Sequence, residues 1–161
     1  MARNILLAVD AQQYAPEATE MALGLWHGTE DKIILLHVHE FAVGRWGRLQ
    51  VDCPEGVAEK LITNIKKTMV DSGVNVSAEI RETHVGHIAR AIAEAADEHN
   101  VAIIVLGSAR TTDLPHIPFG SVTSKVLHLA KCPVMVVPRQ PARARPPAGQ
   151  SQAATDALMT V

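Results

Sequence analysis

The amino-acid sequence predicts a single, doubly wound α/β domain in which helices cover both faces of a five-stranded parallel sheet. Short apolar runs alternate along the chain with longer segments in which apolar residues recur every three or four positions. This alternation is typical of parallel strands joined by right-handed helical crossovers. Three of the five runs are apolar throughout, as expected for strands that are covered on both faces. At 161 residues the chain is long enough for one such domain.

The N-terminal part contains the first two buried strands and the first helix. The run NILLAV predicts a strand over Asn4–Val9, and apolar residues at helical spacing then predict a helix over Tyr14–Trp26. The run KIILLHV predicts the second strand, Lys32–Val38. Residues 41–56 show no clear periodicity, so we expect a loop there.

The middle of the chain contains two helices that flank a strand of a different kind. Apolar residues recurring every four positions predict a helix over Glu55–Asp71, and a second apolar stripe predicts one over Gly86–His99. Between them, apolar and polar residues alternate over Val74–Thr83. Alternation leaves one face dry and the other wet, so we expect this strand to lie at an edge or to have an uncovered face.

The C-terminal part reads as a buried strand, a loop with a glycine at each end, a helix and a last short strand. The strand Val101–Leu106 stops at Gly107, the helix covers Gly120–Ala130, and the last strand is Val134–Val137. The loop joins the carboxyl end of a strand to a helix N-terminus. Backbone N–H groups gathered in this way favour an anion, usually a phosphate.

Composition limits the folded part of the chain and the classes of partner. We assign the α/β domain to residues 1–138; residues 139–161 are rich in Pro, Ala, Gln and Arg and are predicted to be disordered. With only Cys53 and Cys132, no disulfide framework is expected and a reducing cytoplasm is the simplest location. The net charge of −2 argues against nucleic acid as a main partner. No apolar run approaches the roughly 18–20 residues of a membrane helix.

Three stretches resemble the universal stress protein family over residues 3–138: NILLAVD, IILLHV and VLGS…GSVTSKVLHLAKCPVMVV. Nucleotide-binding members of that family carry Gly-x2-Gly-x9-Gly-Ser/Thr. This chain keeps the spacing with Gly107, Arg110 and Gly120-Ser121, one glycine being replaced. The resemblance implies the strand order 3-2-1-4-5. It also implies a homodimer formed through Val134–Val137.

The function implied by the resemblance is that of a cytoplasmic, dimeric stress-response regulator. It would bind ATP or a related adenine nucleotide such as AMP, with Mg²⁺ as companion ion, and act on a regulatory protein partner. The residues that match the family's nucleotide site are Val9, Asp10, Val38, Leu106, Gly107, Arg110, Gly120, Ser121 and Val122. The first three would contact the base, the next two the ribose and α-phosphate, and the last three the phosphates.

Arg110 leaves two interpretations of this site open. Its guanidinium can reach phosphate oxygens bidentately, as arginine often does. Alternatively it closes the crevice, together with Ala11, which stands where the family commonly has a glycine. The chain would then be a dimerisation and interaction module that binds no nucleotide.

Several of these residues also have a purely structural interpretation. Asp10 follows a strand, where an aspartate side chain often caps the next turn. Ser121 suits an N-cap as well as a phosphate contact, because both need a hydroxyl. Gly107 and Gly120 can each be simple turn glycines.

The histidines and the missing catalytic motifs complete the sequence evidence. His37 and His39 share one side of a strand, but no acid or cysteine stands beside them at a recognisable ligand spacing, so no metal site is expected. No catalytic set of residues is legible either, with neither a Walker lysine nor a nucleophile elbow. We therefore expect a binding protein, or at most a slow ATPase.

Overall fold

The computed structural model describes residues 2–28, 30–108 and 120–138. Its elements are β1 (Asn4–Ala8), α1 (Pro16–Leu25), β2 (Lys32–Gly44), β3 (Gly47–Gln50), α2 (Val57–Asp71), β4 (Val76–His84), α3 (Ile88–Glu98), β5 (Val101–Ser108), α4 (Ser121–Leu129) and β6 (Val134–Pro138). The predicted α/β class is confirmed, and the element ends agree with the sequence analysis within two residues, except after Val38. Arg110 and the segment 139–161 lie outside the described residues.

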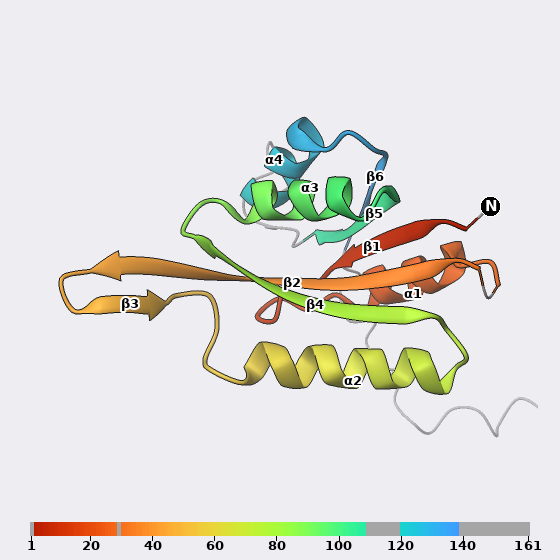
Figure 1. Ribbon diagram of the computed structural model, residues 1–161, viewed down its shortest axis with the longest axis horizontal. Coiled ribbons are helices and arrows are strands. Elements are labelled where there is room, and N and C mark those ends of the chain that lie inside the picture. Colours follow the sequence, from red (N-terminus) through yellow and green to blue (C-terminus); the bar gives the residue numbers. More distant parts are fainter. Residues whose placement is uncertain (1, 29, 109–119, 139–161) are drawn as a thin grey trace, which may run out of the picture.

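Among the described residues, the sheet contains the five predicted parallel strands and, in addition, the antiparallel strand β3, which was not predicted. The parallel strands lie in the order β4-β2-β1-β5-β6, which is the order that the resemblance implied. The chain moves outward from β1 to β2 and β4 on one side, and from β5 to β6 on the other (Figure 1). The order therefore reverses between β1 and β5, and ligands of such sheets bind at that point, outside the carboxyl ends of the strands.

The loop prediction for residues 41–56 is wrong over its first part. Strand β2 continues to Gly44, and β3 returns antiparallel to it after the two residues Arg45 and Trp46. Gly47 has φ +110, which suits glycine in so tight a turn. All residues of β3 are exposed, so no apolar alternation marks it in the sequence. The signal that was available is the pair of glycines that brackets a two-residue loop.

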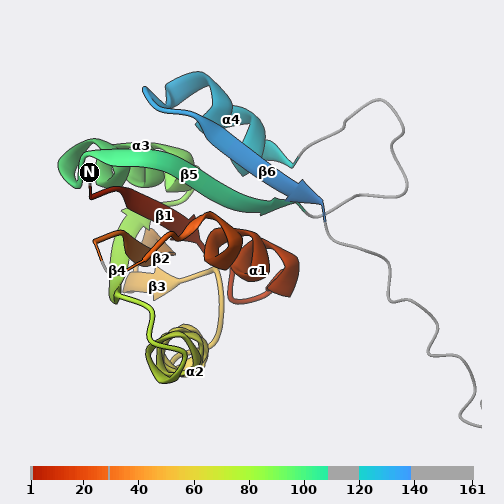
Figure 2. The same cartoon turned by 90° about the vertical axis from the view of Figure 1, so that its right-hand side faces the viewer.

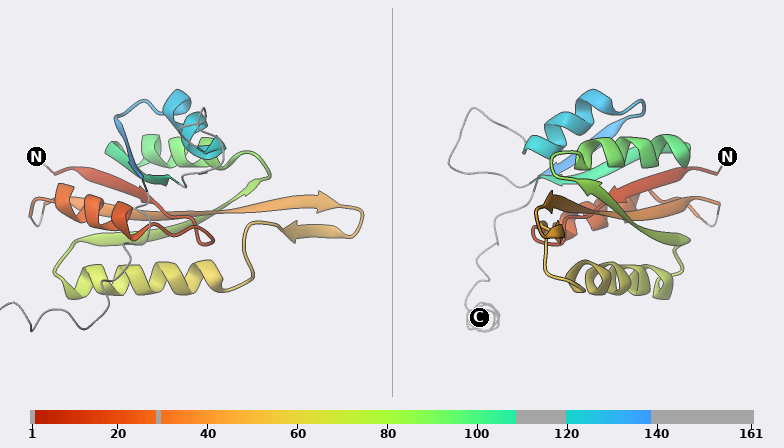
Figure 3. Two further views of the ribbon diagram at one scale, coloured as in Figure 1. Left: turned by 180° about the vertical axis from the view of Figure 1, so that it is seen from behind. Right: turned by 60° about the vertical axis from the view of Figure 1, so that its left-hand side comes forward.

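Two apolar clusters, one on each face of the sheet, hold the domain together. Helices α1 and α2 cover one face of the sheet, and α3 and α4 cover the other (Figures 2 and 3). Ile5, Leu7 and Leu35 belong to the cluster with α1 and α2, and Leu6, Ile34 and Leu36 to the cluster with α3 and α4. Each of these side chains is at most 1% exposed, and burial of one contributes about 1.5–3 kcal/mol. In the described part of the chain, no helix is long and apolar enough to cross a bilayer.

A buried carboxylate joins the start of β1 to the turn before β2. The Asp31 side chain is 4% exposed; it pairs with the Arg3 guanidinium and accepts the backbone N–H of His27 at 3.0 Å. The hydrogen bond from the Arg3 side chain, followed by that from His27, holds the pKa of Asp31 well below its usual range. A carboxyl whose pKa is lowered by folding stabilises the fold above its unfolded pKa, near 3.9, and loses that effect as the pH falls toward the folded value.

We therefore expect Asp31→Asn to lower the urea midpoint at pH 7, and the difference from the unchanged protein to shrink as the pH falls below about 4. Urea titrations at several pH values between neutrality and acid measure this. Asp71→Asn is the matched control, because Asp71 is 60% exposed and pairs with the exposed Lys67. Equal pH profiles for the two variants would contradict the assignment.

Candidate functional site

A cavity of about 440 Å³ opens at the carboxyl ends of the central strands. The ends of β1 and β5, the middle of β2 and the first residues of α4 line it, so it lies where the strand order reverses. Its volume falls within the roughly 300–1,000 Å³ that small-molecule sites occupy. Eight of the nine residues predicted to bind nucleotide line this cavity: Val9, Asp10, Val38, Leu106, Gly107, Gly120, Ser121 and Val122. The ninth is Arg110, outside the described residues.

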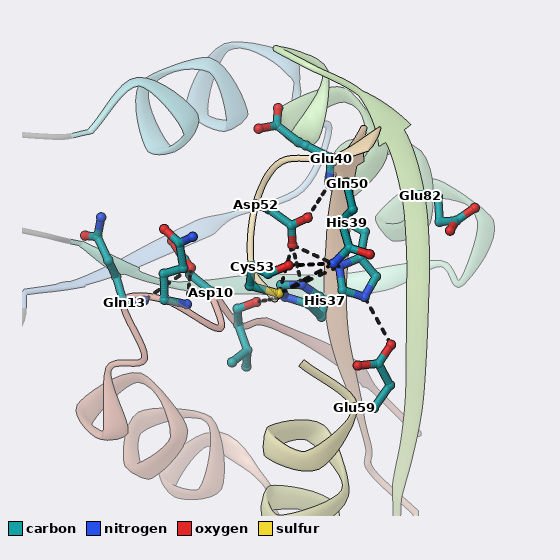
Figure 4. Close-up of polar contacts among 12 residues, drawn as sticks. Asp10, Gln13, His37, His39, Glu40, Gln50, Asp52, Cys53, Glu59 and Glu82 are labelled. Atoms are coloured by element: carbon teal, nitrogen blue, oxygen red, sulfur yellow. Dashed lines mark hydrogen bonds and ion pairs between the residues drawn. The ribbon is translucent and has the colours of Figure 1, made fainter. Parts of the chain in front are cut away.

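The lining of the cavity includes two apolar side chains and a carboxylate. Val9 and Val38 are 8% and 6% exposed and belong to opposite faces of the sheet. The Asp10 side chain accepts the backbone N–H groups of Gln12 at 2.8 Å and Gln13 at 3.2 Å through Oδ1 (Figure 4). Asp10 thus caps the turn after β1, as the structural interpretation had it, and lines the cavity as well.

The N-terminus of α4 also lines the cavity. Gly120 is the N-cap residue, with φ −63 and ψ 164, and no side chain caps the helix among the described residues. The Gly120 carbonyl accepts the N–H of Ser124 at 3.0 Å, which closes the first turn. The N–H groups of the residues between them have no acceptor within the helix, and the helix dipole adds positive potential there.

The two glycines of the motif, Gly107 and Gly120, differ in what a side chain at each position would meet. A Cβ at Gly107 would lie 2.7 Å from the Ala15 Cβ, so this glycine lets the start of α1 pack against β5. A Cβ at Gly120 would meet no described atom within 4 Å, and its φ of −63 suits any residue. Backbone strain does not require glycine at position 120, and neither does packing against the described residues. Close approach of a ligand to the backbone would require it.

The cavity also has lining residues that the sequence analysis missed. Gln12, Gln13 and Tyr14 come from the turn after β1, Glu40 from β2 and Thr123 from α4. Gln12, with Ala11 before it, stands where the family commonly has Gly-Ser. Glu40 gave no signal, because β2 was expected to end two residues earlier.

Beside the cavity, four side chains from two segments form what we call the His-Asp-Cys cluster: His37, His39, Asp52 and Cys53. The nitrogen, oxygen and sulfur atoms that they direct inward all lie within 4.8 Å of one another (Figure 4). His37 and Asp52 also line the cavity. Sequence spacing could not reveal the cluster, because the unforeseen β2–β3 hairpin is what returns Asp52 and Cys53 to the histidines.

Burial and hydrogen bonding shift two pKa values in this cluster. Burial alone would raise the pKa of Asp52, but hydrogen bonds from His39, Cys53 and His37 outweigh it and lower that pKa to about 2. Burial, followed by the neighbouring Asp52 carboxylate, raises the pKa of the Cys53 thiol to about 11. As it stands, the cluster holds an ionised aspartate beside a protonated thiol.

Comparison with known proteins relates the chain to one family. Residues 1–138 match the model of the universal stress protein family. Universal stress protein YxiE of Bacillus subtilis is 29% identical, and the match covers 85% of this chain and 99% of that protein. Two solved structures share the fold: a universal stress protein in complex with cAMP (TM-score 0.61, 17% identity, 86% of this chain and 98% of that one) and one from Archaeoglobus fulgidus in complex with dAMP (TM-score 0.57, 18% identity, 83% and 96%). The chain belongs to the universal stress protein family.

Proposed function

We propose that this universal stress protein is a cytoplasmic, dimeric regulator that binds ATP or a related adenine nucleotide, with Mg²⁺ as companion ion, in the cavity between β1, β5 and α4. The observation that carries the proposal is the start of α4. Among the described residues, no side chain caps its first N–H groups, which border a cavity, and neither strain nor packing requires the glycine beside them. Such a helix N-terminus binds phosphate.

The part of the cavity lined by Val9, Asp10 and Val38 suits an adenine base. Val9 and Val38 offer apolar surface on which a flat ring can pack. The bonds from Gln12 and Gln13 fall on one oxygen of the Asp10 carboxylate, and a carboxylate has acceptor sites for an exocyclic amine besides. Two universal stress proteins of the same fold are described as complexes with cAMP and with dAMP, which also contain adenine. This supports an adenine nucleotide over other phosphates.

Calorimetric titration of the full chain with ATP, with and without Mg²⁺, tests the proposal. We expect saturable binding and a rise in melting temperature, because a ligand that binds only the folded state stabilises it. AMP, cAMP and inorganic phosphate in parallel show which part of the nucleotide is bound. If neither binding heat nor a thermal shift is seen at millimolar nucleotide, the alternative remains that the chain is a dimerisation and interaction module that binds no nucleotide. In that case Arg110→Gly is the diagnostic change, because it should create nucleotide binding if Arg110 closes the crevice.

We also propose that the homodimer forms through β6. This strand pairs with β5 on one side and, in the described part of the chain, has no other partner strand. Its valines and methionine are apolar, and Val134, Met135 and Val136 are only half-buried. An exposed apolar edge of this kind readily pairs with another chain.

Val136→Lys is expected to convert the dimer to a monomer, because a charge at the strand edge opposes edge-to-edge pairing. Light scattering coupled to gel filtration measures the mass. Val70→Lys is the matched control, since Val70 is 52% exposed and lies on α2, away from β6. A mass that does not change in Val136→Lys would place the interface elsewhere.

A further inference from the structure

The His-Asp-Cys cluster has the distances of a metal site. Asp52 Oδ2 lies 2.9 Å from His39 Nδ1, 3.2 Å from His37 Nε2 and 3.2 Å from Cys53 Sγ. Ligand atoms around a tetrahedral zinc ion, with bonds of about 2.0–2.3 Å, lie roughly 3.3–3.7 Å apart. The three distances from Asp52 are slightly shorter than that, the distance of 3.9 Å between Cys53 Sγ and His39 Nδ1 is slightly longer, and all four atoms lie within 4.8 Å of one another. Small movements of the side chains would therefore form the site. We propose that this cluster binds a divalent transition-metal ion, with Zn²⁺ preferred.

The outer nitrogen of each histidine has an acceptor of its own. His37 Nδ1 lies 2.8 Å from the Val9 carbonyl, which can only accept, so Nδ1 donates, and in the neutral form of the ring Nε2 is then available to a metal. His39 Nε2 lies 3.3 Å from the Glu59 carboxylate, and the neutral tautomer that donates to Glu59 leaves Nδ1 available in the same way. Histidine ligands of metals typically give their outer N–H to a carbonyl or carboxylate in this way.

The inner side of the cluster therefore brings four metal-binding atoms together. His37 Nε2 and Asp52 Oδ2 lie 3.2 Å apart, and in the neutral form of a ring that donates through Nδ1 both atoms are acceptors. The Gln50 side chain donates to His39 Nδ1 at 3.0 Å, and the Cys53 thiol donates to Asp52. A cation between His37 and Asp52 would satisfy both atoms. Cysteine as the fourth ligand favours a transition-metal ion.

Outer contacts hold the acidic ligand and select the kind of ion. The backbone N–H of Glu40 donates to Asp52 Oδ1 at 3.2 Å, which leaves Oδ2 directed inward. The donor set combines two imidazoles, one thiol and one carboxylate. Imidazole and thiolate suit zinc and its neighbours, whereas Mg²⁺ and Ca²⁺ require oxygen ligands. His37 and Asp52 border the cavity, which gives an ion a path from solvent.

The test is a metal titration of the chelator-treated full chain without a histidine tag and without nucleotide. Zn²⁺ measured against a chromophoric chelator is expected to bind at one ion per chain, and Mg²⁺ and Ca²⁺ are not. Co²⁺ is expected to give the visible bands of a tetrahedral site and a thiolate charge-transfer band. Because no nucleotide is present, the result is independent of the proposed nucleotide function. No stoichiometric uptake at micromolar Zn²⁺ would overturn the proposal.

Variants assign the binding to the cluster. Cys53→Ser should weaken Zn²⁺ binding more than about 100-fold and remove the charge-transfer band, because loss of an outer partner alone costs about 10–100-fold. Glu59→Gln, on the half-exposed start of α2, should weaken it about 10-fold without affecting folding. Cys132→Ser and His128→Gln are the matched controls and should bind as the unchanged chain does. Binding that survives Cys53→Ser, or falls equally in Cys132→Ser, would show that the cluster is a hydrogen-bond network without a metal.

Discussion

Replacing Gly120 by aspartate is expected to weaken ATP binding about 100-fold while leaving the fold as stable as before. Aspartate is a better N-cap than glycine, by about a few tenths of a kcal/mol, and the position has room for its Cβ. The same carboxylate would occupy the N–H groups at the start of α4 and repel a phosphate. Two like charges about 4 Å apart at a protein surface repel by up to about 4 kcal/mol, and about 2.8 kcal/mol is a 100-fold change.

The opposite signs of the two effects make the experiment informative. Calorimetry measures the affinity, and a melting curve without ligand measures the stability of the same sample. Gly44→Asp is the matched control: it adds the same charge at an exposed position of the β2–β3 hairpin where a Cβ also meets nothing within 4 Å. If ATP affinity falls no further in Gly120→Asp than in Gly44→Asp, the phosphate does not bind at the N-terminus of α4.

The parts of the fold that the sequence predicted are those in which one local pattern decides the outcome. The apolar runs of β1, β2 and β5 are buried between two helix layers, and nothing polar in them competes with a strand. The alternation over β4 correctly placed it at an edge, because a strand with one wet face must show that period. A strand that is buried on both faces has a continuous apolar run, whereas a strand that is buried on one face has alternating apolar and polar residues.

The hairpin escaped prediction because solvent, not the core, surrounds it. Val43 and Leu49 are each 67% exposed and Trp46 is 95% exposed, so their apolar character does not report burial. The pairing of β3 depends on backbone bonds to β2 and on the Arg48 guanidinium over the Phe41 ring. The His-Asp-Cys cluster was missed for the same reason. Its acid and its thiol reach the histidines only through this hairpin.

The candidate nucleotide site was more accessible to sequence analysis, since its residues lie at strand ends and helix starts that the element pattern already fixes. The sequence could not show why a particular residue type stands at each position of the site. Gly107 and Gly120 look alike in the sequence, yet among the described residues Gly107 has a neighbour that excludes a side chain and Gly120 does not. Packing partners such as Ala15 come from a distant segment, and one sequence contains no record of which residues meet.

Gly107→Ala is expected to destabilise the domain by about 1–3 kcal/mol, a fall of roughly 3–10 °C in melting temperature, because the new Cβ overpacks the contact between α1 and β5. That Cβ would lie 2.7 Å from the Ala15 Cβ, well inside van der Waals contact. Ala15 is the N-cap of α1, a position where glycine is preferred to alanine. Ala15→Gly alone should therefore change stability little.

The double variant Ala15→Gly with Gly107→Ala transfers the methyl group from the helix to the strand and should recover most of the loss. Melting curves of the four proteins give the coupling energy, which we expect to be about 1–2 kcal/mol for residues in direct contact. Gly120→Ala is the reference for an added methyl in open space and should cost less than about 1 kcal/mol. If Ala15→Gly gives no rescue, Gly107 is required by something other than the approach of α1, and a role at the ligand would then account for it.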